Sequence, residues 1–113
     1  MIIRIKNLLV RIKIGVQPAE RDKLQDVLIN ISIESDDPPR TDRLADTIDY
    51  KEATKKILAA VEQTRFELIE TLAGFVLDLI MTDKRIKHAT VEIDKPHALR
   101  FSESVSVTLE RSR

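Results

Sequence analysis

Apolar and polar residues alternate at the start of the chain. Two runs, Ile3–Lys6 and Val10–Ile14, place an apolar side chain at every second position. A period of two is typical of a β-strand with one buried face. The two runs are out of phase with each other, so a single strand over Ile3–Ile14 requires a kink or bulge near Asn7. Gly15 ends this strand, and a polar loop follows it.

The alternation occurs again over Val27–Glu34, where Val or Ile occupies every second position. Pro38 and Pro39 come after this predicted strand, and proline ends a strand because it has no N–H to donate to a neighbour. A charged connector, Arg40–Asp46, leads to the next element. The chain up to this connector therefore predicts two strands and no helix.

Helical spacing replaces the alternation after the connector. Asp49–Glu52 has the sequence of a capping box, and apolar residues then recur three or four positions apart. A second box over Thr64–Glu67 predicts that a second helix begins there, which places Glu70 in its second turn. We expect this helix to end near Asp83.

The period of two returns in the last quarter of the chain. His88–Asp94 and Ser104–Glu110 are predicted strands, and Lys95–Phe101 joins them. The order strand, strand, helix, helix, strand, strand predicts an α+β fold, a four-stranded antiparallel sheet with both helices on one face. The other face carries polar residues and is able to face water. Pairing of the two open edges in a closed ring of subunits would satisfy their backbone groups.

Length and composition narrow the classes of protein. The 113 residues are enough for a single domain over 1–113 with one core. The 19 basic and 19 acidic residues balance, so charge provides no general attraction to nucleic acid or to acidic membranes. Cysteine is absent, and neither a signal peptide nor a membrane span is evident, which favours a cytoplasmic protein. A core this small is marginal alone, which favours an oligomer.

Four short motifs follow one another along the predicted elements. They are Ile14-Gly15-Val16 followed by Glu20, Asp49-Tyr50, the run Arg65-Phe66-Glu67-Leu68-Ile69-Glu70, and Asp94-Lys95-Pro96. Together with the element order, these motifs resemble the dihydroneopterin aldolase family, which has the tunnelling fold (T-fold). The resemblance extends from Ile3 to Glu110. It implies an enzyme that acts on a small-molecule pterin and needs no cofactor.

One segment resembles a particular branch of this family. The sequence of Glu92–Arg100 is similar to that of epimerases acting on dihydroneopterin triphosphate, and so is the opening Ile2–Leu8. For this branch the implied reaction is epimerisation at C2′ through reversible retro-aldol cleavage. Two alternatives stay open. One is a 7,8-dihydroneopterin aldolase of folate synthesis, which gives 6-hydroxymethyl-7,8-dihydropterin and glycolaldehyde; the other is a non-catalytic pterin-binding ring protein.

The resemblance also implies roles for individual residues. Glu70 is the expected pterin anchor, because a carboxylate accepts two parallel hydrogen bonds from the amino group and ring nitrogen of the pterin. Backbone groups near Ile69 are expected to bind the remaining ring edge. Lys95 and Tyr50 are the expected proton-transfer groups, and Glu20 is expected beside the pterin side chain. Each residue also has an ordinary interpretation as a solvated or core-edge side chain.

A triphosphate tail requires cations, and two residues outside the shared aldolase set are candidates. Arg100 matches phosphate geometry, and His97 lies close to it in sequence. No metal site is predicted, because His88 and His97 are the only histidines and no cysteine is present. The resemblance implies a homo-octamer of two stacked tetrameric rings, with active sites between subunits.

Overall fold

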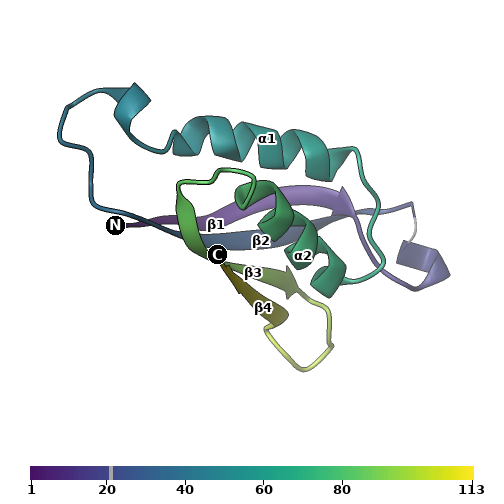
Figure 1. Ribbon diagram of the computed structural model, residues 1–113. Helices are drawn as coiled ribbons and strands as arrows, with labels where there is room; N and C mark the ends of the chain where they lie inside the picture. The colour runs from purple at the N-terminus through teal and green to yellow at the C-terminus, as the bar shows by residue number, and fades with distance from the viewer. Residues whose placement is uncertain (21) are drawn as a thin grey trace.

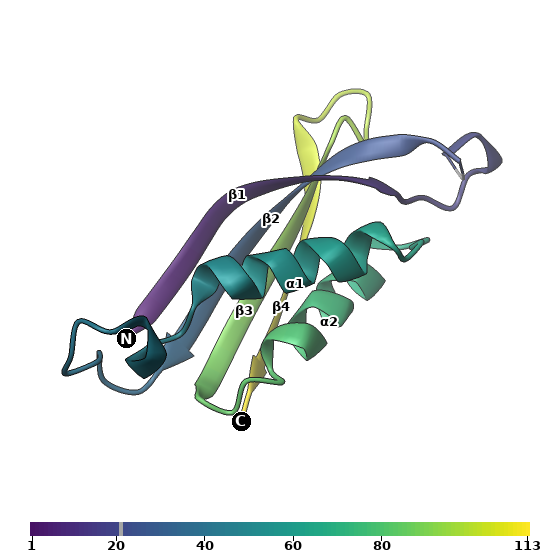
Figure 2. The same cartoon turned by 90° about the horizontal axis from the view of Figure 1, so that it is seen from above.

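The computed structural model describes residues 1–20 and 22–113. Its four strands form one antiparallel sheet in the order β1-β2-β3-β4. Both α-helices cover the same face of this sheet (Figures 1 and 2). The elements are β1 (Ile2–Lys13), β2 (Leu24–Ser35), α1 (Tyr50–Glu62), α2 (Ile69–Ile80), β3 (Ile86–Pro96) and β4 (Ser104–Ser112), with short 3-10 helices η1 (Pro18–Glu20) and η2 (Leu44–Asp46). The predicted fold class and element order are confirmed.

The core lies between the sheet and the two helices. In β2 every second side chain from Val27 to Ile33 is almost completely buried, and Val91 and Ile93 of β3 continue this surface. The helices contribute a matching apolar stripe: Ile57, Val61, Leu72, Ala73, Val76, Leu77 and Ile80. The opposite face of the sheet is polar, with Asn30, Ser32, Thr90 and Thr108 around a shallow hollow. One apolar and one polar face were predicted, and both are present.

An irregularity interrupts β1 where the sequence predicts one. The pairing of β1 with β2 shifts register between Ile5 and Leu8, and Asn7 has a φ of 52°. Asparagine tolerates this left-handed conformation better than most residues. The Asn7 backbone N–H donates to Asn30 Oδ1 at 2.8 Å, and Asn30 Nδ2 donates to Asn7 Oδ1 at 3.2 Å. The bulge brings the two apolar runs of β1 onto the same face.

The helix α1 begins as predicted. Asp49 is its N-cap, and its Oδ1 accepts hydrogen bonds from the backbone N–H groups of Lys51 and Glu52. Tyr50 is therefore the first helical residue. Its side chain is 60% exposed.

The predicted start of the second helix is wrong. Thr64 does not cap α2; its hydroxyl donates to the Ala60 carbonyl at 2.9 Å and closes the end of α1. The helix α2 begins at Ile69 with Leu68 at the N-cap, where no side-chain capping bond is made. Glu70 consequently lies in the first turn and not in the second.

The sheet explains why the helix starts late. Phe66 forms an isolated parallel bridge with Ile14 at the end of β1. Its N–H donates to the Lys13 carbonyl at 3.3 Å, and its carbonyl accepts from the Gly15 N–H at 3.1 Å. Phe66 is also almost completely buried. Backbone groups that pair with the sheet cannot also form the first turn of a helix.

Several elements extend beyond their predicted limits. The third strand is Ile86–Pro96, so Lys95 lies inside a strand and not just after it. The predicted loop after Gly15 contains η1, which places Glu20 on an ordered turn. In the part of the chain that is described, no helix has the length and apolar character needed to cross a membrane.

The Asn7–Asn30 pair provides a test of the bulge. We expect Asn30→Ala to lower the free energy of unfolding by about 1–2 kcal/mol, because the Asn7 N–H loses its acceptor. Ser32→Ala, on the same face of β2, is the control and should change stability by less than about 0.5 kcal/mol. Urea denaturation measures both. Equal stability of the two variants would show that the pair does not fix the bulge.

Candidate active site

An ion pair lies at the end of the sheet where β1 and β3 finish. Lys95 Nζ donates to Glu20 Oε2 at 3.1 Å. The two residues are 75 positions apart in the chain, and their side chains are 16% and 29% exposed, respectively. The sequence predicted both as site residues, and the structure places them in direct contact.

Two further residues fix the carboxylate of Glu20. Gln25 Nε2 donates to Glu20 Oε2 at 3.4 Å and to the Ile14 carbonyl at 2.6 Å. Gly15, with a φ of 137°, supplies the space, because a Cβ at this position would lie 1.7 Å from Glu20 Oε2. The carboxylate is thus held between an ammonium group, an amide and a glycine.

These contacts set the charge of Glu20. The hydrogen bond from Lys95 holds the pKa of the Glu20 carboxyl below its usual range, and the bond from Gln25 acts in the same direction. Partial burial opposes both. Glu20 is therefore an anion at neutral pH. Its contribution to stability is present above its ordinary pKa and is lost as the pH falls through the lowered value.

The ion pair opens into a hollow of about 450 Å³ at the protein surface. The hollow is lined by Ala19, Glu20, Lys23, Leu24, Gln25, Lys95, His97 and Ala98. His97, a candidate for phosphate binding, thus lines the same hollow as Lys95. Its φ of 61° turns the chain out of β3. Lys23 also lines this hollow, as a second lysine beside Lys95, and the sequence did not indicate it as a candidate.

The start of α2 lies at the same end of the molecule. Phe66 pairs with Gly15, Gly15 packs against Glu20, and Glu20 contacts Lys95. Ile69 and Glu70 follow Phe66 directly. The first N–H groups of a helix have no partner inside the helix, and Leu68 offers no side-chain acceptor. Glu70 is exposed, and these backbone donors adjoin it.

Tyr50 lies at the opposite end. Its helix has 13 residues, so the phenol and the start of the Phe66 segment are separated by about 20 Å of helix. The contact of Arg85 with Thr47 also ties the beginning of α1 to the beginning of β3, far from Lys95. A single chain therefore does not bring Tyr50 to the Lys95–Glu20 pair.

Arg100 is not part of the hollow. Its guanidinium carbon lies 5.4 Å from the ring centre of Phe101, and both residues are in the exposed hairpin loop between β3 and β4. Phe101 is 95% exposed, and Leu99 of the same loop is 58% exposed. Among the described residues, no group of three or more His, Cys, Asp or Glu side chains is arranged to hold a metal ion.

Gln25 and Lys23 carried no signal in the sequence. Gln25 looks like an ordinary polar residue before a strand, and Lys23 like a solvated loop lysine. Both reach the site because β2 begins at Leu24, pairs with the end of β1, and so returns beside Gly15. Only the pairing of these strands reveals their position.

Comparison with known protein families shows where this chain belongs. A sequence model of dihydroneopterin aldolase matches residues 3–110, almost the whole chain. The chain belongs to the dihydroneopterin aldolase family.

Members of this family differ in how similar they are to the chain. Dihydroneopterin triphosphate 2′-epimerase of Pseudomonas aeruginosa is 42% identical, covering 98% of this chain and 92% of that protein. The Escherichia coli K12 epimerase is also 42% identical, covering 99% of this chain and 95% of that protein. The crystal structure of E. coli dihydroneopterin aldolase in complex with neopterin has a TM-score of 0.92 at 28% identity and covers 99% of both chains.

A glycine substitution tests whether the space at Gly15 positions Glu20 against Lys95. We expect Gly15→Ala to displace Glu20 from Lys95 and to lower the free energy of unfolding by about 1–3 kcal/mol, since it adds strain at positive φ. The matched control is Gly74→Ala in α2, where a Cβ meets nothing within 4 Å. It should be neutral or stabilising by up to about 1 kcal/mol. Thermal denaturation and a crystal structure of each variant would measure these effects; an undisturbed Glu20 in Gly15→Ala would contradict the expectation.

Proposed function

We propose that this protein epimerises 7,8-dihydroneopterin triphosphate at C2′ to 7,8-dihydromonapterin triphosphate by reversible retro-aldol cleavage. The observation that carries the proposal is the 42% identity to two epimerases over nearly their full length, against 28% to the E. coli aldolase of closely similar fold. The cytoplasm is the proposed location.

In the proposed reaction, Lys95 transfers a proton at the pterin ring nitrogen, and Tyr50 transfers one at the C2′ hydroxyl of the side chain. The phenol oxygen of Tyr50 takes the proton of the C2′ hydroxyl as it passes its own proton to water, and a C2′ carbonyl forms as the C1′–C2′ bond breaks. The bonding electron pair moves into the dihydropterin ring, whose nitrogen next to the side-chain carbon receives a proton from Lys95 through a water molecule. Re-addition to the opposite face of the aldehyde returns both protons and gives the epimer.

Glu20 is proposed to hold Lys95 and the water in place. Its carboxylate is fixed by Lys95, by Gln25 and by the space at Gly15, so it has little freedom to move. Glu70 is proposed to accept two hydrogen bonds from the pterin, and the backbone near Ile69 to bind the other edge. The exposure of Glu70 in the first turn of α2, where Leu68 makes no side-chain capping bond, supports this role.

The proposed active site is shared between two subunits. Tyr50 is on the far end of α1 from Lys95, so it must serve the site of a neighbouring copy. The free edges of β1 and β4 suit pairing in a ring. The exposed Leu99 and Phe101 also favour a further protein contact. We propose a homo-octamer of two stacked tetrameric rings.

The triphosphate explains why the aldehyde would be retained. His97 and Lys23 line the hollow beside Lys95, and the loop that carries Arg100 follows directly. Cations that hold the phosphates slow the escape of the aldehyde fragment, which favours re-addition over release.

The second candidate function is 7,8-dihydroneopterin aldolase. It is favoured by the fold and by the use of the same four residues, Glu20, Tyr50, Glu70 and Lys95. The difference between the two activities is whether the aldehyde leaves before it re-adds. A non-catalytic pterin-binding protein is less well supported, because pterin binding alone requires no lysine–glutamate pair.

A product assay tests the function. We expect mainly monapterin from dihydroneopterin triphosphate after oxidation and dephosphorylation, separated by chromatography. Lys95→Ala should reduce turnover by about 10²–10⁴-fold, the range for a proton-transfer group. Lys84→Ala, in the turn after α2, is the control with unchanged turnover. Mainly 6-hydroxymethylpterin, formed from unphosphorylated dihydroneopterin, would instead make the protein an aldolase.

The phosphate contacts predict a change in product ratio. We expect Arg100→Ala and Lys23→Ala each to raise the KM for the triphosphate substrate by about tenfold, the effect of losing about 1.4 kcal/mol of binding. The KM for unphosphorylated dihydroneopterin should not change. Released aldehyde should increase, as measured by the yield of 6-hydroxymethylpterin. An unaltered KM and product ratio would exclude the substituted residue from phosphate binding.

A further inference from the structure

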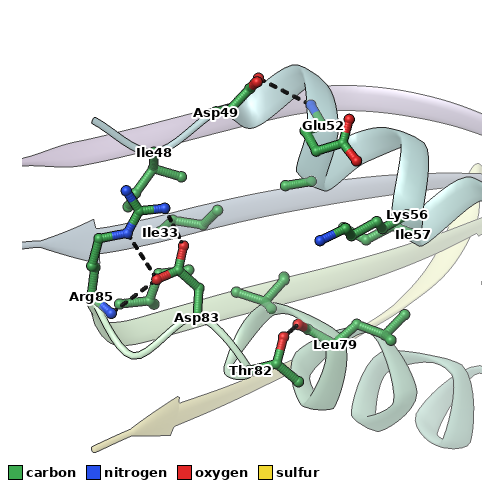
Figure 3. A pocket seen from close by; sticks show the side chains of 13 residues that line it. Ile33, Ile48, Asp49, Glu52, Lys56, Ile57, Leu79, Thr82, Asp83 and Arg85 are labelled. Carbon is green, nitrogen blue, oxygen red and sulfur yellow. Dashed lines mark hydrogen bonds and ion pairs between the residues drawn. The ribbon is translucent and has the colours of Figure 1, made fainter. Parts of the chain in front are cut away.

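Another hollow, separate from the one beside Lys95, lies between the start of α1 and the turn that joins α2 to β3 (Figure 3). It has a volume of about 180 Å³ and an apolar floor that includes Ile33 and Ile57. Asp83 and Arg85 lie on its rim, and their side chains face each other in Figure 3. None of the residues assigned above to substrate binding or catalysis lines this hollow.

Arg85 uses its whole guanidinium group at this rim. Its Nε donates to Asp83 Oδ1 at 3.0 Å, and its Nη2 donates to Asp83 Oδ2 at 2.7 Å. The remaining nitrogen, Nη1, donates to the Thr47 carbonyl at 2.8 Å. Thr47 is 38 residues away in the chain. Asp83 thus fixes the plane of the guanidinium group, and the third nitrogen holds a distant segment.

The pair is ionised over the physiological pH range. The hydrogen bond from Arg85 lowers the pKa of Asp83, and the same bond raises the pKa of Arg85. The Asp83 carboxylate also accepts a hydrogen bond from the Arg85 backbone N–H at 3.0 Å. We call the contacts of Arg85 with Asp83 and with the Thr47 carbonyl the clamp. The clamp should therefore persist from acidic to alkaline pH and break only when Asp83 is protonated.

The clamped segment leads directly to Tyr50. Ile48 is 5% exposed and packs into the core, and Asp49 caps α1 through its carboxylate. Tyr50 comes next and points away from the core. Its direction depends on how the segment from Thr47 to Asp49 is held, and Arg85 provides the polar link from that segment to the α2–β3 turn.

We propose that Arg85, fixed by Asp83, is a positioning residue that sets the place from which Tyr50 reaches the active site of a neighbouring subunit. This inference rests on the proposed function, in which Tyr50 transfers a proton. Arg85 touches no substrate. It acts by holding the backbone three residues before Tyr50, and catalytic steps are sensitive to displacements of this kind.

The expected kinetic effect is confined to turnover. Arg85→Ala should lower kcat by about tenfold, because the phenol is no longer held at the right distance. The KM for the pterin should stay within about twofold, since the proposed pterin anchor, Glu70, lies at the opposite end of α2 from the turn that carries Arg85. Arg85→Lys should not restore kcat, because its three donors sit on a single nitrogen, which cannot take the places of Nε, Nη1 and Nη2.

The composition provides a readout that does not depend on activity. Tyr50 is the only tyrosine, and tryptophan is absent, so emission excited at wavelengths longer than the phenylalanine absorption band comes from Tyr50 alone. In Arg85→Ala and Arg85→Lys, we expect lower emission anisotropy and stronger quenching by acrylamide than in the unsubstituted protein. The matched control is Arg43→Ala. Arg43 is an exposed arginine of the connector Arg40–Asp46, and its substitution should change neither emission nor kcat.

The outcomes separate this inference from the proposed function. If Arg85→Ala has the emission of Arg43→Ala, the clamp does not hold Tyr50 and the inference fails. If Arg85→Ala changes the emission but not kcat, and Tyr50→Phe abolishes turnover, the clamp holds Tyr50 but the positioning role fails. If Tyr50→Phe keeps full turnover, the catalytic role of Tyr50 and the positioning role both fail. Should Arg85→Ala not fold, Arg85→Lys and Asp83→Asn keep the side-chain volume and decide the question by the same measurements.

Discussion

The apolar side chains of the sheet lie on one face only, and both helices have to cover it. This constraint decides the rest of the arrangement. The helices run along the sheet, so each begins near one end and finishes near the other. The chain between them returns to the sheet at Phe66, which pairs with the end of β1. As a result, the candidate site residues Tyr50 and Lys95 are found at the ends of the layers and not on their faces.

The length of α1 has a direct consequence for catalysis. It separates Tyr50 from the Lys95–Glu20 pair, so the catalytic group proposed for this family is incomplete in one chain. The same sheet leaves its β1 and β4 edges unpaired. Under the proposed function, the active site needs a second chain, and the sheet carries two open edges; one ring of identical copies would meet both needs. Stability and activity are then linked through the same interface.

An ion pair stabilises each end of the molecule. At one end, Lys95 and Glu20 form a pair at a surface hollow, and the carboxylate is also fixed by Gln25. At the other end, Arg85 and Asp83 hold the segment that carries Tyr50. The first pair faces a surface hollow, whereas the second holds the backbone at Thr47.

The sequence alone determined the element order, the two faces of the sheet, the bulge at Asn7 and the cap at Asp49, because these depend on periods and preferences of neighbouring residues. Motifs also identified Glu20, Tyr50, Glu70 and Lys95 as candidates. Tertiary structure decided the rest. The pairing of Phe66 with β1 overrode the capping box at Thr64, and the pairing of β2 with β1 brought Gln25 beside Glu20. Only strand pairing and helix length could place Tyr50 apart from Lys95, since contacts between distant residues are set by how the elements pack and not by local sequence.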